Sequence, residues 1–436
     1  MCDVVRRGRF LLDYGWGARR MSRDSLARDI LAREFPHLTA HDRPIAGRTV
    51  LQIVPDLQSG GAERATVDVA QTLAQAGARC LVASRGGRMV GELQSKGGVW
   101  TPFPAATKNP LAMALNMPRL ARLIRDEGVD IVHARSRAPA WVAYYAARRA
   151  GALFVTTYHS AYSGASAIKQ RYNAIMAAGD AVIANSDFIA RRIAELHPEA
   201  AGRIVVIPRG VDLRTFAPAA VAPERVERLR AAWGVEPHHR VVLLPARLSA
   251  RKGHAVLIEA ATRLLAQGLE QGFEDVRFIF VGDAHSESFR RGVDARISRA
   301  GLVGLVRSMG YCADMPAAYL AAAVIVAPST EPEAFGRVAV EAQAMGAPVV
   351  VSDIGAAAGI VLAPPRTSPR EATGQRVPPG DAEALACAIN AALALKASAR
   401  DALSLRARAH VRHRFSVEEM CRATLDVYER LLADRI

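Results

Sequence analysis

From Thr49 onward the sequence alternates short apolar runs with stretches of helical periodicity, and this alternation constrains the fold more than any other feature. Runs that are apolar throughout predict buried strands, because a strand covered by helices on both faces of a parallel sheet needs no polar side. Helical segments such as 65–76 and 113–126 separate these runs. The pattern predicts an α/β layer with a mostly parallel sheet. Its first series of strands comprises 50–54, 80–83, 131–134, 154–158, 181–184 and 205–207.

The same alternation starts again after residue 237, so the chain contains two such layers in tandem. Its 436 residues exceed what one typical core serves. We therefore predict two Rossmann-like, doubly wound domains that face one another across a cleft. The second series of strands comprises 241–244, 276–281, 306–309, 324–327 and 348–352. The predicted segments are an extension at 1–48, a first domain at 49–218, a linker at 219–237, a second domain at 238–412 and a final helix at 413–436.

The chain is strongly basic, with 57 lysines and arginines against 42 aspartates and glutamates and a formal net charge of +15. Such a field attracts phosphorylated substrates, nucleic acid or an acidic membrane surface. Arginine-rich coding bias explains part of the charge equally well, so the charge selects no partner. Residues 1–48 hold ten arginines and six acidic residues. They are either a basic arm for an anionic membrane or a partly ordered extension or over-long translation start, and we favour the second interpretation.

Cysteine usage and hydropathy predict a cytoplasmic protein. The cysteines are odd in number and scattered without a CxxC pair, which argues against a disulfide framework or a zinc site and suits a reducing compartment. No apolar run approaches the roughly 20 residues that span a bilayer, and no signal peptide is visible. The inner face of the cytoplasmic membrane stays open as a second location. The five cysteines are Cys2, Cys80, Cys312, Cys387 and Cys421.

The strongest local signal follows the predicted strand 324–327. A proline-broken turn leads into a helix that we expect to start near Phe335 and to run to Met345. The free N–H groups at such a helix start bind a phosphate or diphosphate well. Glu333 lies just before the helix start and Glu341 about two turns later, where a carboxylate can accept hydrogen bonds from a ribose diol. Taken alone, two glutamates eight residues apart also fit a solvated helix face.

A second signal follows the first strand of the second domain. Arg247 stands at the strand end and Lys252 five residues later, before Gly253. An arginine fork and a mobile lysine can clamp a diphosphate between them. A solvated basic loop is the alternative interpretation of the same residues.

Taken in order, these motifs resemble the donor site of the retaining glycosyltransferases of family 4 (group 1), and the likeness extends over roughly residues 49–436. The ordered set is more specific than any single motif. It comprises Gly60-Gly61-Ala62-Glu63-Arg64, Ile207-Pro208-Arg209-Gly210-Val211-Asp212, the Arg247 to Gly253 loop, Val281-Gly282-Asp283, the pair Glu333 and Glu341, and Arg376-Val377-Pro378-Pro379-Gly380-Asp381.

The resemblance implies a GT-B fold with an acceptor domain first and a donor domain second, and a UDP- or GDP-linked sugar as co-substrate. It implies transfer with retention at the anomeric carbon, with no metal and no other cofactor. Glu333 would contact the donor sugar or support charge near its anomeric centre, and Glu341 would bind the ribose. Arg247 and Lys252 would neutralise the departing diphosphate, which is physically sensible because the leaving group gains negative charge. Further donor contacts would come from Gly282, Phe335, Gly336, Arg337 and Val338.

Three further positions of the first domain follow from the resemblance. His159, at the end of a predicted strand, would hydrogen-bond donor or acceptor hydroxyls; a satisfied strand-end histidine is the alternative. Gly60 and Gly61, in a loop before a helix expected near Ala65, would lie against the diphosphate or the acceptor; an ordinary turn is the alternative.

The sequence also departs from the family pattern. Arg209 stands where many members have asparagine, and an additional Glu331 leaves the donor role open between it and Glu333. Spacing to Glu341 favours Glu333.

The sequence motifs say less about the acceptor than about the donor. The resemblance favours a glycan or glycolipid acceptor, in the synthesis of lipopolysaccharide or another cell-surface glycan, with a peripheral contact to the anionic inner membrane face. The final helix would cross back onto the first domain, and closure of the cleft would exclude water. Rival interpretations are a nucleotide-sugar epimerase or a phosphorylase of the same shape, a basic nucleic-acid-binding protein and a degenerate scaffolding transferase. We expect no nucleic-acid partner, because no recognition motif is present.

Overall fold

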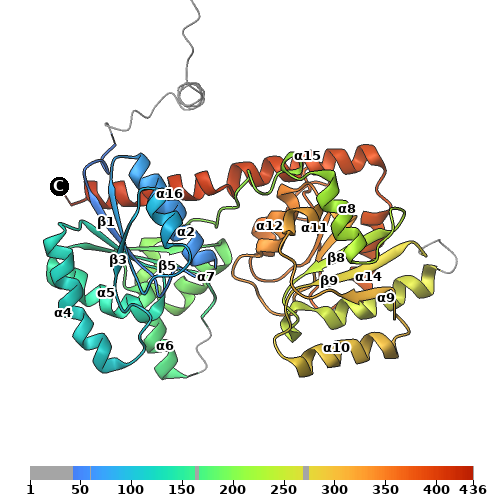
Figure 1. The fold of residues 1–436 in the computed structure, drawn as a ribbon, viewed down its shortest axis with the longest axis horizontal. Helices are drawn as coiled ribbons and strands as arrows, with labels where there is room; N and C mark the ends of the chain where they lie inside the picture. Colours follow the sequence, from blue (N-terminus) through green and yellow to red (C-terminus); the bar gives the residue numbers. More distant parts are fainter. Residues whose placement is uncertain (1–42, 59, 163–165, 269–273, 436) are drawn as a thin grey trace, which may run out of the picture.

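The computed structural model describes residues 43–58, 60–162, 166–268 and 274–435 and forms two α/β domains side by side (Figure 1). The expected basic extension therefore lies almost entirely outside the described residues. Within them, one sheet has seven strands and the other six, and every strand pair is parallel. The prediction of two Rossmann-like domains is confirmed.

The first sheet has the strand order β3-β2-β1-β4-β5-β6-β7, so the order reverses between β1 and β4. Ligands of open α/β sheets bind beyond the carboxyl ends of the strands near such a reversal. The elements are β1 (Thr49–Ile53), α2 (Gly61–Gln75), β2 (Arg79–Ser84), α3 (Val90–Ser95), β3 (Val99–Pro102), α4 (Pro110–Asp126), β4 (Ile131–Ala134), α5 (Arg137–Ala150), β5 (Leu153–Tyr158), α6 (Ala167–Ala174), β6 (Ala181–Ala184), α7 (Asp187–Leu196) and β7 (Ile204–Val206).

The second sheet has the order β10-β9-β8-β11-β12-β13, with its reversal between β8 and β11. Helix α8, which lies in the predicted linker, packs against α11, and Arg225 Nε donates to Asp314 Oδ2 at 2.8 Å. The elements are α8 (Pro223–Ala232), β8 (Arg240–Pro245), α9 (His254–Gly268), β9 (Val276–Val281), α10 (Glu287–Arg299), β10 (Val306–Ser308), α11 (Met315–Ala321), β11 (Val324–Ala327), α12 (Arg337–Ala344), β12 (Val349–Ser352), α13 (Ala357–Ile360), β13 (Gln375–Val377), α14 (Ala382–Leu393), α15 (Ala397–Arg414) and α16 (Val417–Ala433).

Each sheet is covered on both faces, as its apolar strands predict. All five residues of β1 are buried. Neighbouring residues of a strand point to opposite faces, and so Val50 joins the core under α2 and α16 while Leu51 joins the core under α4 and α5. This two-sided burial removes the polar side that a one-sided sheet would show in its sequence.

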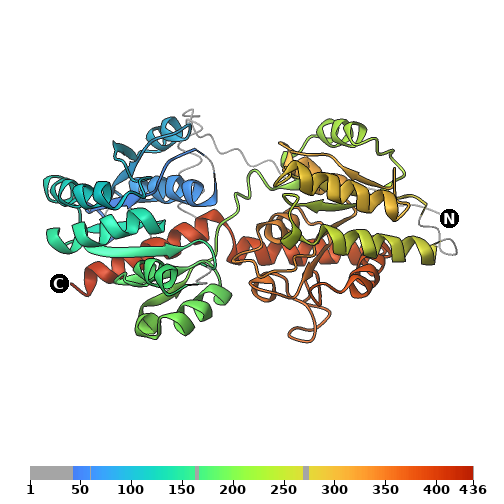
Figure 2. The same cartoon turned by 90° about the horizontal axis from the view of Figure 1, so that it is seen from below.

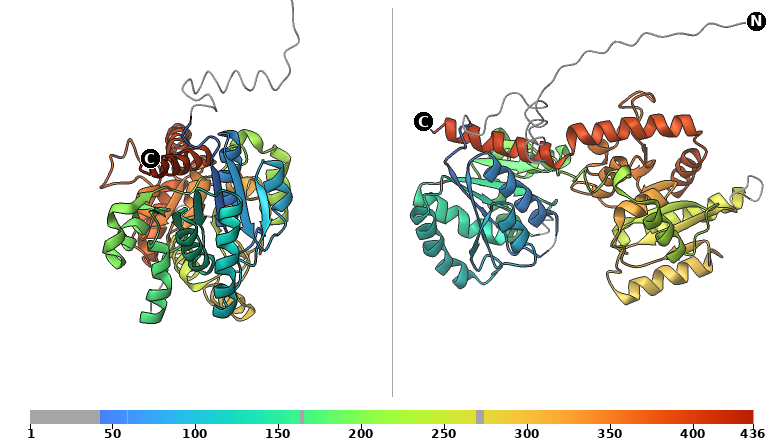
Figure 3. Two further views of the ribbon diagram at one scale, coloured as in Figure 1. Left: turned by 90° about the vertical axis from the view of Figure 1, so that its left-hand side faces the viewer. Right: turned by 45° about the horizontal axis from the view of Figure 1, so that its top comes forward.

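The C-terminal helices cross from the second domain to the first (Figures 2 and 3). Ser416 caps α16 by accepting a hydrogen bond from the Glu419 amide at 3.2 Å. Leu425 and Tyr428 of α16 are fully buried in the core of the first domain. The tail thus ties the two domains together at the point where Val211 pairs with Ser416.

Two strands are absent from the sequence prediction, and two helices begin a few residues away from their predicted starts. The missed strands β3 and β13 are edge strands, whose partly exposed residues form no continuous apolar run. Helix α2 begins at Gly61 rather than near Ala65, and α12 begins at Arg337 rather than near Phe335. In both cases glycine stands at the N-cap, where side-chain capping signals are missing.

No single helix in the described part of the chain is long and apolar enough to cross a membrane. The pair α14 and α15 reaches that length and composition only when joined across a bend of 108°.

Candidate donor site in the interdomain cleft

A cavity of about 840 Å³ lies between the two domains. The first domain contributes the start of α2, part of α3 and the segment 209–216. The second domain contributes Phe335, Arg337, Val340 and Glu341, and α16 closes one side with Val417 and Met420. Its size is within the range of ligand-binding pockets. We call it the donor cavity.

Two arginines from different domains meet at the N-terminus of α2. A Cβ atom at Gly61 would lie 2.5 Å from Nη1 of Arg209 and 2.5 Å from Nη2 of Arg337. Burial, followed by the charge of Arg337, lowers the pKa of Arg209 to about 10. Two cations beside the positive end of a 15-residue helix repel one another. Glu63 near Arg209 and Glu341 near Arg337 offset part of this repulsion, and an anion bound between the two guanidinium groups would offset more. The arrangement is therefore suited to a phosphate or diphosphate.

Gly60 and Gly61 permit this approach. Gly60 has a φ of 139°, which favours glycine, and it stands at the N-cap of α2. At Gly61 any side chain would displace the two guanidinium groups. The glycine pair thus leaves room at the helix N-terminus for the Glu63 carboxylate and the two guanidinium groups.

Glu341 lies inside the donor cavity on α12. Its carboxylate accepts a hydrogen bond from the Tyr319 hydroxyl at 2.8 Å, and Arg337 Nε lies 3.8 Å away. Burial raises the pKa of Glu341 to about 7, although Arg337 and Tyr319 both act against this rise. Near pH 7 the Glu341 carboxyl group at the cavity wall is therefore partly ionised, and its oxygens can accept further hydrogen bonds from a diol.

Glu333 is held in place by the basic loop of the same domain. Lys252 Nζ contacts Glu333 Oε1 at 2.6 Å, and the Ser329 hydroxyl donates to the same oxygen. Both charged side chains are mostly buried, at 17% and 23% exposure. Glu331 is exposed, so the geometry favours Glu333 over Glu331 as the functional carboxylate, but neither Glu333 nor Lys252 lines the donor cavity.

Close backbone packing brings the two loops together. The Thr330 amide donates to Arg251 O at 2.9 Å, and Gly253 lies so near Pro328 O that no side chain would fit. On the other side, a Cβ atom at Gly282 would lie 2.5 Å from Ala246 O. Gly282 therefore supports the Arg247 loop rather than facing the donor cavity.

The structure does not bring Arg247 to the donor cavity. Its side chain is exposed and makes no hydrogen bond or ion pair with any described residue. Gly336 stands at the N-cap of α12, in a left-handed conformation with a φ of 47°. The amides of Arg337 and Val338 lie in the first turn of α12, where the helix itself provides no carbonyl acceptor for them, so they can donate to a ligand.

His159 contacts Arg209, the first-domain member of the arginine pair. Its carbonyl accepts hydrogen bonds from Arg209 Nη2 at 3.3 Å and from Asn185 Nδ2 at 3.4 Å. Both ring nitrogens are buried, and neither has a partner among the described residues. Burial, followed by the charge of Arg209, holds the pKa of His159 well below its ordinary value. A neutral, unpaired imidazole can donate to or accept from a substrate hydroxyl.

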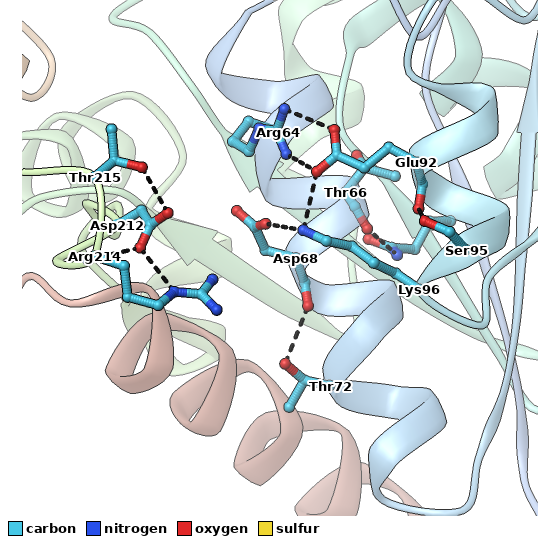
Figure 4. Close-up of polar contacts among 11 residues, drawn as sticks. Arg64, Thr66, Asp68, Thr72, Glu92, Ser95, Lys96, Asp212, Arg214 and Thr215 are labelled. Atoms are coloured by element: carbon cyan, nitrogen blue, oxygen red, sulfur yellow. Dashed lines mark hydrogen bonds and ion pairs between the residues drawn. The ribbon is translucent and has the colours of Figure 1, made fainter. Parts of the chain in front are cut away.

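A paired charge network that the sequence did not predict covers the α2–α3 side of the donor cavity (Figure 4). Arg64 holds Glu92 in a two-pronged ion pair, with the longer contact at 3.0 Å, and Lys96 links Glu92 at 3.0 Å to Asp68 at 3.7 Å. The Arg64 hydrogen bond lowers the pKa of Glu92 to about 2, whereas burial raises that of Asp68. On the facing segment, Asp212 is held by Arg214 and Thr215.

Three of the site's side chains, Arg209, Tyr319 and Ser329, were not predicted as site residues. Arg209 was visible only as a departure from the family pattern. Tyr319 reaches Glu341 from a different helix, α11, and Ser329 reaches Glu333 across a turn. In the described residues no group of three or more histidines, cysteines or carboxylates is arranged to hold a metal ion.

Two facing Rossmann-like domains with an anion-suited cleft between them are the architecture of the GT-B fold. Residues 59–215 match the family model of Glycosyltransferase Family 4, and residues 239–394 match that of Glycosyl transferases group 1. A solved glycosyltransferase from Rickettsia africae is 34% identical, with 88% of this chain and 98% of that chain covered and a TM-score of 0.78. The chain therefore belongs to the GT-B glycosyltransferases of family 4, group 1.

Other relatives share less of the sequence. Anabaena Alr3699/HepE, solved in complex with UDP and glucose, is 25% identical, with 88% of this chain and 100% of that chain covered and a TM-score of 0.72. The D-inositol 3-phosphate glycosyltransferase of Kineococcus radiotolerans is 32% identical over 281 residues, which are 60% of this chain. The match spans 59% of the length of that relative.

Proposed function

We propose that this protein is a retaining, metal-independent glycosyltransferase that moves a sugar from a nucleoside diphosphate to a glycan or glycolipid acceptor. The bond from the anomeric carbon to the diphosphate oxygen breaks, and a bond from the same carbon to an acceptor hydroxyl oxygen forms. The electron pair leaves with the diphosphate, and the acceptor proton leaves with it or with solvent. A solved relative binds UDP and glucose, which supports a UDP-linked donor.

The meeting of Arg209 and Arg337 at Gly61, beside Glu341 in one cavity, carries this proposal. The arginine pair and the start of α2 supply fixed positive charge for the diphosphate, which does not have to reorganise during the reaction. Glu341 supplies acceptor oxygens for the ribose of the same nucleotide. This division places the nucleotide in the second domain and its diphosphate at the boundary between the domains.

Glu333 and His159 are proposed to act at the sugar. Lys252 and Ser329 fix the Glu333 carboxylate, so it can support positive charge that develops at the anomeric centre. The unpaired ring of His159 would hydrogen-bond a hydroxyl of the donor or acceptor. When the donor binds, Lys252 would divide its charge between Glu333 and the diphosphate.

We also propose a contact with the anionic inner face of the cytoplasmic membrane, in cell-surface glycan synthesis. Leu111, Leu115 and Ile168 are exposed by 77%, 70% and 83% on α4 and α6. Both helices follow carboxyl ends of strands and both contact α5: α4 packs along it, and Tyr172 of α6 stacks on Trp141 of α5. Exposed Lys108 and Lys169 flank these apolar side chains, and apolar residues with basic neighbours suit an anionic interface.

The transferase proposal is tested by product analysis of the purified full chain with UDP- and GDP-sugars, with and without candidate glycan acceptors. We expect sugar transfer that depends on the acceptor, with the anomeric configuration of the donor kept in the product when measured by NMR. Conversion of the donor sugar without an acceptor would instead identify an epimerase. Transfer to inorganic phosphate would identify a phosphorylase, and either result would overturn the proposal.

A further inference from the structure

A second cavity between the domains, of about 300 Å³, shares Phe335 with the donor cavity. We call it the rear cavity. The first domain contributes Asn185 and the beginning of α7, and the second contributes the segment 355–360 and Arg366. Arg414 and Phe415, at the junction of α15 and α16, complete the lining. The size is at the lower end of the range for ligand pockets.

The walls of the rear cavity carry an excess of unpaired positive charge. Arg191, Arg366 and Arg414 are all exposed, and none makes an ion pair with a described residue. Asp187 is the acidic side chain of the lining and offsets part of this charge. The three arginines come from α7, from the segment after α13 and from the end of α15, so the cavity wall carries positive charge from both domains.

A buried polar side chain points to a ligand at the same place. Asn185 is 1% exposed, and its Oδ1 atom has no hydrogen-bond partner among the described residues. A buried amide oxygen without a partner is unfavourable unless a ligand or water donates to it. The next residue, Ser186, caps the ten-residue helix α7, whose first amides add to the positive field.

The rear cavity also borders the reacting centre. Asn185 Nδ2 donates to the carbonyl of His159, and the Ser186 hydroxyl donates to Ala334 O across the domain boundary at 2.6 Å. Ala334 follows Glu333 in the sequence, so both contacts connect the rear cavity to residues proposed to act on the sugar. The nucleotide anchor Glu341 lines the donor cavity instead.

We propose that the rear cavity binds a phosphate or carboxylate group carried by the acceptor, an inference that rests on the proposed transferase function. Arg191, Arg366 and Arg414 bind the anionic group, and Asn185 accepts a hydrogen bond from a neighbouring hydroxyl of the same molecule. Because the arginines come from both domains, an anionic acceptor also favours closure of the cleft around it.

The first test is calorimetry with inorganic phosphate at constant ionic strength, in the presence of saturating UDP so that the donor cavity is filled. We expect phosphate to bind the wild-type chain and Arg366→Gln to weaken it by about tenfold, as for a lost charge-assisted hydrogen bond. Asp187→Asn should strengthen it, and Arg291→Gln, on the exposed surface of α10, is the matched control. Absence of phosphate binding, or equal binding by Arg366→Gln, would overturn the proposal.

A second variant tests whether phosphate binds in the rear cavity itself or only through the overall positive charge of the chain. Gly359 lines the rear cavity, and a side chain there would start in ordinary contact with Asp187. Gly359→Glu should therefore abolish phosphate binding and leave UDP binding unchanged. Phosphate binding that survives Gly359→Glu contradicts the rear cavity as its site. If the wild-type chain does not bind UDP at all, that result contradicts the proposed function rather than the rear-cavity proposal.

Glucose 6-phosphate, titrated in the same way, distinguishes an acceptor group from a free anion. Binding tighter than that of inorganic phosphate, and weakened by Asn185→Ala, supports an acceptor with a hydroxyl near its anionic group. Binding no tighter than that of inorganic phosphate contradicts the acceptor assignment.

Discussion

The two domains hold the charges of the candidate site differently. On the second-domain side, each carboxylate is held by one or two neighbours of the same domain: Glu333 by Lys252 and Ser329, and Glu341 by Tyr319. On the first-domain side, Arg209 is mostly buried without a carboxylate partner and faces Arg337 of the other domain. The glutamates of the second domain are therefore paired within their own domain. Among the first-domain charges, the Arg64, Glu92 and Lys96 network is paired as well, and Arg209 is the cation that an anion between the domains would pair.

Under the proposed function, this difference separates residues that would organise the sugar from residues that would bind the charge of the nucleotide. Substitutions on the second-domain side should affect the chemical step most. Substitutions of the arginine pair should affect donor affinity, and substitutions in the paired network of Arg64 and Glu92 should affect little. The predictions below follow this order.

The largest effect is expected from Glu333→Gln and Lys252→Ala. Loss of a fixed carboxylate at the reacting centre should lower kcat by roughly 100-fold or more, because an electrostatic group aimed at developing charge contributes several kcal/mol. Lys252→Ala should also lower the thermal midpoint, because it leaves the mostly buried Glu333 carboxylate without its cation. Glu331→Gln is the matched control and should retain kcat within about twofold. A Glu333→Gln enzyme with wild-type kcat would remove this residue from the site.

The next effect concerns the arginine pair. Arg209→Ala and Arg337→Ala should each raise the Kd for UDP by about tenfold, because each removes a charged hydrogen-bond donor to phosphate. Uridine, which lacks the diphosphate, should bind both variants and the wild-type chain equally. Calorimetry that shows unchanged UDP affinity in both variants would contradict the proposed diphosphate position.

The third prediction uses the raised pKa of Glu341. Between pH 6 and pH 8 the carboxyl group of the free protein ionises, because its pKa is about 7. If the carboxylate binds the ribose diol, uridine affinity should rise by up to about tenfold over this range, as the ionised fraction does. Uridine has no phosphate that titrates there. Glu341→Gln should bind uridine more weakly at pH 8 and without this pH dependence, and a slope that persists in Glu341→Gln would assign it to another group.

The same ionisation affects stability. The folded protein holds a proton on Glu341 that the unfolded chain releases near pH 4.5, so this group stabilises the fold at low pH. That contribution is lost as the pH rises through about 7. Urea unfolding should therefore show Glu341→Gln gaining stability relative to wild type between pH 5 and pH 8. A constant difference across this range would contradict the burial of an ionisable Glu341.

The smallest effect is expected from the network of Arg64, Glu92 and Lys96. These side chains are partly exposed, and ion pairs of this kind contribute about 0–1 kcal/mol to stability. A double-mutant cycle with Arg64→Ala and Glu92→Ala should give a coupling energy in that range, decreasing with added salt. A coupling above about 2 kcal/mol would show that the network is a structural element of the cleft.

Motifs near strand ends were predictable because each lies within one short segment. Local spacing is enough to predict the helix after β11, the glutamates at 333 and 341 and the loop that ends at Gly253. The structure then brings Lys252 of this loop to Glu333. Gly282 and Arg247 were identified by the same logic, yet the structure places Gly282 beneath the loop and Arg247 on its surface. Spacing shows that a residue is near a strand end, but it does not show which way its side chain points.

The sequence by itself determined the class of fold, because two-sided burial in parallel sheets leaves continuous apolar runs that repeat in two series. Only the tertiary structure decided which cations share a cavity. Arg209, Gly61 and Arg337 are far apart in the chain, and their meeting depends on how the two domains and the returning α16 pack. Each of these residues suits its own local segment, and the repulsion between Arg209 and Arg337 arises only when the two domains pack side by side.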